Sequence, residues 1–163
     1  MIKILIADDH LLIRQGLRLI LETESDLELV GEADDGREAV SLCNKLKPDV
    51  VLMDLRMPNM GGLTAIEKLR VDHPNIAVVI LTTFNEDDLM LRGLQAGARG
   101  YLLKDTDRNT LFNTIRAAAR GETLLKPEIM AQVLSLANAA STNEIHSPAF
   151  ANLTEREQEV LKA

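Results

Sequence analysis

IKILIADDH, residues 2–10, is a mostly apolar run that stops at the acid pair Asp8 and Asp9. DVVLMD, residues 49–54, repeats this pattern and stops at Asp54. Runs of this kind are typical of the buried strands of a parallel sheet, and ligands gather outside the carboxyl ends of such strands. We therefore expect the three acids to meet at one edge of a parallel sheet.

The first 121 residues alternate short β-rich runs with segments whose apolar residues recur at helical spacing. This alternation predicts βαβ crossovers and an α/β fold, with a parallel sheet covered by helices on both faces. Turn signals at Asp35-Gly36 and at Met60-Gly61-Gly62 mark the starts of the second and third helices. The expected strands are residues 2–7, 27–33, 49–54, 76–82 and 98–104.

The composition narrows the class of protein. The chain has 163 residues, of which 46% are hydrophobic and 26% charged, so neither a disordered chain nor a membrane protein is expected. A single cysteine, Cys43, excludes an internal disulfide, and no signal-peptide pattern opens the sequence, which favours the cytoplasm. The formal net charge of −7 argues against a nucleic-acid surface within this stretch.

Three carboxylates at one edge repel one another, so the predicted cluster needs a cation. Mg²⁺ suits it, because this ion takes oxygen ligands and commonly binds one or two carboxylates together with a phosphoryl group. A carboxylate oxygen beside the cation could attack phosphorus and form an aspartyl phosphate. Thr82 and Lys104 each close a later apolar run and would offer a hydroxyl and an ammonium group to the phosphoryl oxygens.

Three other classes of protein are alternatives to a phosphorylated switch. A haloacid dehalogenase-type hydrolase also uses a strand-end Asp with magnesium, but it needs a second acid two residues later, where this chain has Arg56. A flavin or nucleotide binder needs a phosphate-cradling loop after the first strand, where Asp8 and Asp9 would repel the phosphate. A module that is never phosphorylated remains the third alternative.

The sequence assigns no chemical role to the histidines or to the cysteine. His10, His73 and His146 are scattered without metal-ligand spacing, so no chemistry is assigned to them, and His10 is treated as a bystander at the rim of the site. Cys43 lies among apolar residues at helical spacing, which is typical of a small core residue. An acid pair such as Asp8-Asp9, taken alone, often only caps a helix.

Residues 1 to 121 resemble the receiver domains of bacterial two-component response regulators. The resemblance is carried by the acid pair, by Asp54 with Pro58 four residues on, and by Thr82, Tyr101 and Lys104. It implies a flavodoxin-like, doubly wound sheet of five strands in the order 2-1-3-4-5. One departure is Asp105, because many receivers have a cis proline after the lysine. The sequence leaves the isomer of this bond open, since a non-proline cis bond costs about 2.5 to 4 kcal/mol.

The resemblance also implies a mechanism. A sensor histidine kinase would donate a phosphoryl group to Asp54, and Lys104 would pair with it. Thr82 and Tyr101 would then move as a switch that favours a homodimer. The chain is expected to be no enzyme beyond accepting the group on its own aspartate and releasing it. The implied Mg²⁺ ligands are Asp8, Asp9, Asp54 and the backbone carbonyl of Arg56.

The C-terminal part resembles the NarL/FixJ subfamily, which carries a LuxR-type helix-turn-helix. GETLLKPEI, residues 121–129, resembles the subfamily's connector, and LTEREQEVLKA, residues 153–163, resembles the start of its DNA-binding domain. Thr154 and Glu157 form a capping box, which predicts a helix start. We therefore expect a receiver at 1–121, a linker with a helix at 122–152 and a first-helix remnant at 153–163. DNA contact is expected only through a C-terminal domain mostly absent from these residues.

Overall fold

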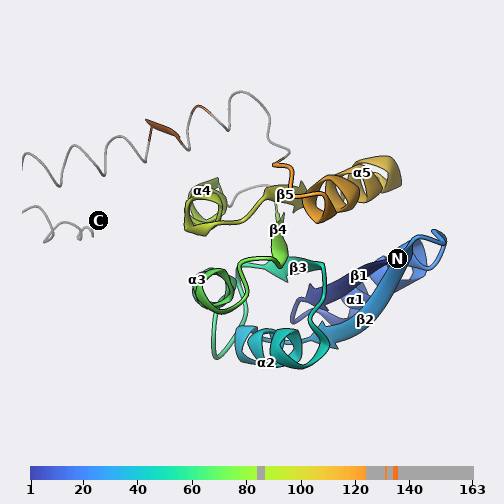
Figure 1. Ribbon diagram of the computed structural model, residues 1–163, viewed down its shortest axis with the longest axis horizontal. Coiled ribbons are helices and arrows are strands. Elements are labelled where there is room, and N and C mark those ends of the chain that lie inside the picture. The colour runs from blue at the N-terminus through green and yellow to red at the C-terminus, as the bar shows by residue number, and fades with distance from the viewer. Residues whose placement is uncertain (84–86, 124–130, 132–133, 136–163) are drawn as a thin grey trace, which may run out of the picture. The chain divides into compact units, whose positions relative to one another are not determined.

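The computed structural model describes residues 1–83, 87–123, 131, 134 and 135. Within them, five strands alternate with five helices (Figure 1). The strands are β1 (Ile2–Ala7), β2 (Leu27–Ala33), β3 (Val50–Asp54), β4 (Ala77–Thr82) and β5 (Gly100–Leu103). The helices are α1 (Leu11–Leu21), α2 (Gly36–Leu46), α3 (Gly62–Asp72), α4 (Asp87–Ala96) and α5 (Arg108–Ala119).

All strand pairs are parallel, and the sheet order is β2-β1-β3-β4-β5. This order confirms the predicted flavodoxin-like sheet. The strand bounds agree closely with the sequence pattern except in β5, which is shorter than the expected residues 98–104. The backbone N–H of Ala98 donates to the carbonyl of Gly93 in α4, so the chain there still closes the helix.

Helices cover both faces of the sheet. In Figure 1, α1 and α5 lie on one side of the strands and α2, α3 and α4 on the other. On the first face, Ile4, Val50 and Val79 pack in a buried cluster with Phe112 and Ile115 of α5. The central strands β3 and β4 are buried along their whole length, and so are the last four residues of β1, which explains why the sequence shows continuous apolar runs there rather than alternation.

The loop between β3 and α3 is held against the start of α2. The backbone N–H of Gly36 donates to the carbonyl of Met60 at 2.8 Å, and the side chain of Asn59 donates to Asp35 at 2.8 Å. Asp35 also caps α2 by accepting from the N–H of Glu38. A Cβ at Gly36 would lie 2.3 Å from the Met60 carbonyl oxygen, so only glycine allows this close approach.

We therefore expect Gly36→Ala to lower the free energy of unfolding by about 1 to 3 kcal/mol, the usual cost of overpacking. Gly16→Ala is the matched control, because apart from the adjoining helix backbone and chain neighbours no atom of the described residues lies within 4 Å of a Cβ placed there. That change in the middle of α1 should raise stability by about 0.5 to 1 kcal/mol, since alanine favours the helix. Urea unfolding followed by circular dichroism measures both. Equal stability of Gly36→Ala and the wild type would contradict the packing described.

Cys43 is fully buried in α2, which confirms its prediction as a core residue. Burial raises the pKa of its thiol to about 12. No helix among the described residues is both long and apolar enough to cross a membrane. The predicted capping box at Thr154 and nearly all of the predicted linker helix lie outside the described residues.

Candidate functional site

The carboxyl ends of three strands bring three charged side chains together. Asp8 follows β1, Asp54 ends the neighbouring β3, and Lys104 follows β5. The Lys104 Nζ lies 3.0 Å from Asp8 Oδ2 and 3.2 Å from Asp54 Oδ2. Both aspartates are buried, with 0% and 2% of their surface exposed. The predicted meeting of Asp8, Asp54 and Lys104 at one sheet edge is therefore what the structure shows.

One oxygen of each buried aspartate is held by the backbone. Asp8 Oδ1 accepts from the N–H of His10 at 2.8 Å, and Asp54 Oδ1 accepts from the N–H of Arg56 at 3.1 Å. These bonds form because the chain turns sharply as it leaves each strand. They fix the orientation of both carboxylates and leave the second oxygens aimed at the space between the strands.

Those second oxygens, Asp8 Oδ2 and Asp54 Oδ2, are buried and accept no hydrogen bond from any residue that the structure describes. The Lys104 ammonium forms an ion pair with both oxygens. One ammonium group faces three carboxylates, so the cluster keeps a negative charge, which is costly in a buried site unless a further cation compensates it. The donor set, all hard oxygens, fits Mg²⁺.

The charged groups of the cluster shift one another's pKa values. Burial raises the pKa of Asp54, an effect opposed by the Arg56 N–H and the Lys104 ammonium and reinforced by the charge of Asp8. Burial by itself would lower the pKa of Lys104, but its contacts with Asp8 and Asp54 outweigh burial and raise this pKa. Lys104 therefore stays charged at neutral pH, where it offers a cation to an incoming anion.

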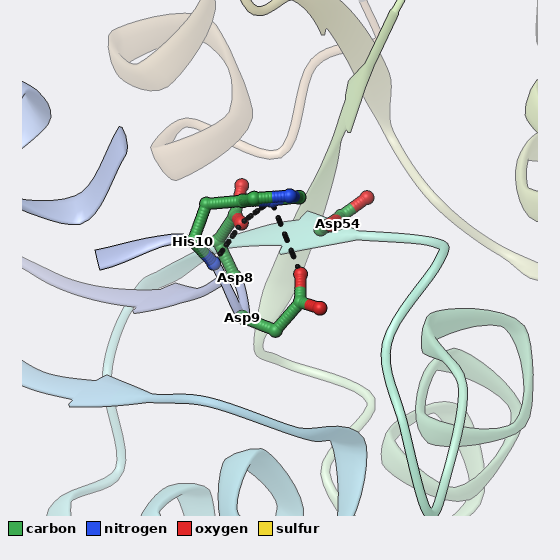
Figure 2. A group of neighbouring side chains, drawn as sticks. All are labelled: Asp8, Asp9, His10 and Asp54. Atoms are coloured by element: carbon green, nitrogen blue, oxygen red, sulfur yellow. Dashed lines mark hydrogen bonds and ion pairs between the residues drawn. The ribbon is translucent and has the colours of Figure 1, made fainter. Parts of the chain in front are cut away.

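Asp9 completes the cluster from a more open position. Its side chain is 33% exposed, and its Oδ1 lies 3.2 Å from the Nδ1 of His10. Figure 2 shows Asp8, Asp9 and His10 side by side, with Asp54 next to them at the end of β3. Ligand atoms of these four residues all lie within 4.8 Å of one another.

His10 and Arg14 contact this cluster, and the sequence pattern assigned a role to neither of them. His10 Nδ1 lies 3.0 Å from Asp8 Oδ1, so its side chain contacts the acids from the exposed rim of the site, where the sequence placed it. Its place directly after the acid pair is the signal that would have found it. Arg14 donates to the backbone carbonyl of Asp8 and pairs with Glu32 of β2, which only the fold brings near.

The two predicted switch residues lie in neighbouring strands. Thr82 ends β4 and is buried, and its hydroxyl donates to the carbonyl of Thr83 at 3.1 Å. Tyr101 lies half-buried in β5, in register with Ile80 of β4. The hydroxyl of Thr82 is thus at the correct strand end but faces the next peptide, so its contact with a phosphoryl group stays a prediction.

Comparison with known proteins adds independent findings. Residues 4–116 match the response regulator receiver domain family. The transcriptional regulatory protein YdfI of Bacillus subtilis (strain 168) is 46% identical over 161 residues, which cover 99% of this chain and 74% of that protein. The response regulator protein VraR of Staphylococcus aureus (strain NCTC 8325 / PS 47) is 38% identical over 160 residues, covering 98% and 74%.

Solved structures agree with the sequence relatives. A two-component response regulator of the LuxR family from Aurantimonas sp. SI85-9A1 superposes with a TM-score of 0.72 at 32% identity, covering 82% of this chain and 95% of that one. A LuxR-family DNA-binding response regulator from Staphylococcus aureus gives a TM-score of 0.68 at 29% identity, covering 73% and 99%. The chain therefore belongs to the response regulator receiver family, among the transcriptional regulators of the NarL/FixJ, LuxR-type branch.

Proposed function

We propose that this protein is switched by phosphorylation of Asp54, with a sensor histidine kinase as the donor. An Asp54 carboxylate oxygen attacks the phosphorus of a phosphohistidine, so that a P–O bond forms and the P–N bond breaks. The departing imidazole keeps the electron pair of that bond and takes a proton. The surroundings of Asp54 support this role. Its side chain is buried, one of its oxygens accepts a hydrogen bond from the N–H of Arg56, and Lys104 lies beside it.

In this proposal Asp8, Asp9, Asp54 and the carbonyl of Arg56 hold Mg²⁺, directly or through water. The ion supplies charge neutralisation for the acids and for the phosphoryl oxygens. The excess of three carboxylates over the single Lys104 ammonium, with carboxylate oxygens within 4.8 Å of one another, supports a cation at this position. Asp9 is the most open of the three acids and gives the site its contact with solvent.

Lys104 then stabilises the new charge. Its Nζ already lies 3.2 Å from Asp54 Oδ2, so the ammonium group can pair with the phosphoryl oxygens without a large movement of the Lys104 side chain. Thr82 turns its hydroxyl from the Thr83 carbonyl toward the phosphoryl group, and Tyr101 moves inward behind it. These shifts bias a two-state surface built from the last strands and helices.

The observation that carries the proposal is the buried Asp8, Asp54 and Lys104 cluster at the strand ends. Incubation with acetyl phosphate and Mg²⁺ should add one phosphoryl group, a gain of ~80 Da in intact mass. Omitting Mg²⁺ should reduce this gain strongly. A protein that gains no mass at saturating acetyl phosphate and Mg²⁺ would support the alternative of a module that is never phosphorylated.

The output of the switch is control of transcription, and DNA binding is assigned to a C-terminal helix-turn-helix domain. The chain acts in the cytoplasm and processes no separate substrate, apart from releasing its own phosphoryl group. The similarity to transcriptional regulators supports this output. The net charge of −7 is unlike that of a surface that binds the DNA backbone, so the receiver itself is not assigned to DNA.

Phosphorylation should favour a homodimer, since helix-turn-helix proteins usually read paired half-sites as dimers. The surface is either that of α1 and α5 or the region of α4. Leu12 and Leu19, on one side of α1, are 81% and 67% exposed, which supports the first surface. Sedimentation should show a shift toward dimer with beryllofluoride, a stand-in for the phosphoryl group. A monomer with and without it at high concentration would contradict this expectation.

A further inference from the structure

We propose that His10 is a metal ligand, and that the acid cluster therefore also takes a first-row transition-metal ion such as Co²⁺ or Zn²⁺, with His10 Nδ1, Asp8 and Asp9 as ligands. This inference rests on the cation site of the proposed function and concerns which cations that site prefers. The three residues follow one another in the sequence, directly after β1.

The geometry supports a shared ion. Ligand atoms bound to one such ion at about 2.0 to 2.1 Å lie about 2.9 to 3.4 Å from each other, between an octahedral and a tetrahedral edge. His10 Nδ1 lies 3.0 Å from Asp8 Oδ1 and 3.2 Å from Asp9 Oδ1. The imidazole nitrogen thus lies at a ligand-to-ligand separation from one oxygen of each carboxylate, and the two carboxylates offer oxygens within 4.8 Å of each other.

The chemistry of the ligand atoms decides which ions the site binds more tightly. Carboxylates and carbonyls suit Mg²⁺, whereas an imidazole nitrogen suits Zn²⁺, Ni²⁺ and other first-row transition metals. A cluster of acids alone would discriminate less between the two groups. In the ion-bound form the metal replaces the hydrogen between His10 Nδ1 and the carboxylates, and the neutral ring carries its proton on Nε2.

The position of His10 allows it to bind without remodelling the fold. The side chain is 64% exposed, so an ion from solvent reaches it directly. His10 is also the N-cap of α1, but its side chain makes no capping hydrogen bond, and its backbone N–H donates to Asp8 Oδ1 whatever the side chain is. Replacing the imidazole therefore removes a ligand and leaves the backbone anchor of the cluster intact.

The test compares tag-free wild type, His10→Asn and His10→Ala. Asparagine keeps a polar side chain of similar reach near Asp8 and lacks the imidazole nitrogen. Titration with Co²⁺, read by its visible absorption and by calorimetry, should show affinity falling by about tenfold or more in both variants. The affinity for Zn²⁺, measured by its competition with Co²⁺, should fall by a similar factor. The rise of melting temperature with Mg²⁺ should stay close to that of the wild type.

The control is the double variant His73→Asn, His146→Asn, which removes the other histidines of the chain and should keep Co²⁺ affinity unchanged. Unchanged Co²⁺ affinity in His10→Asn and His10→Ala would overturn the role of His10 while leaving the magnesium site standing. Loss of the Mg²⁺ response in those variants would also overturn it, because His10 would then serve the acids rather than select the ion. A wild type that responds to neither cation would overturn the proposed function itself.

Discussion

We expect Asp54→Asn to abolish the gain of ~80 Da on treatment with acetyl phosphate and Mg²⁺, because in the proposed reaction the acyl phosphate forms only on a carboxylate beside the cation. This is the largest effect expected of any single change in the chain. The amide has nearly the shape of the carboxylate, and its carbonyl oxygen still accepts from the N–H of Arg56. The variant should therefore fold like the wild type. Intact-mass measurement then shows whether it gains a phosphoryl group.

Asp49→Asn is the matched control, because it makes the same substitution at the opposite end of the same strand. Asp49 precedes β3 and accepts from the backbone N–H of Lys3 at 2.9 Å, a bond that asparagine also makes. This variant should label fully. If Asp54→Asn still gained one phosphoryl group per chain, the acceptor would be another residue, and the assignment of Asp54 would be wrong.

The sheet and the centre of the site could be predicted from the sequence because both follow from one physical constraint. A parallel strand covered on both faces must be apolar along its length, so a charged residue marks its end. Asp8 and Asp54 interrupt such runs, and neighbouring parallel strands end at the same edge of the sheet. The pairing of β1 with β3, which only the family resemblance implied, then places the two acids together.

Other features depend on contacts between distant segments and leave no periodic signal. Arg14 reaches the Asp8 carbonyl from the helical surface of α1, where an arginine normally reads as a solvated charge. Asn59 has a positive φ of 64° and binds Asp35, a contact that depends on the path of the loop between β3 and α3. The orientation of the Thr82 hydroxyl is a choice of rotamer, which strand-end position alone leaves open.

Asp9→Ala should remove most of the stabilisation that Mg²⁺ gives the wild type. A cation that binds only the folded site stabilises it by mass action, by about 2.7 kcal/mol at a hundredfold excess over its dissociation constant. Because Asp9 is the most open of the three acids, its loss removes a ligand without opening a cavity in the core. Melting temperature measured across a magnesium titration, with ionic strength held constant, should rise in the wild type and stay nearly flat in the variant.

Two comparisons make the magnesium experiment specific. Without Mg²⁺, Asp9→Ala should stay folded and melt at or above the wild-type temperature, since it relieves repulsion between the acids. Asp72→Ala, which removes an exposed carboxylate at the end of α3, should keep the wild-type response to Mg²⁺. If Asp9→Ala and the wild type gained equally from Mg²⁺, the ion would have to bind elsewhere, and the cluster at the strand ends would not be the cation site.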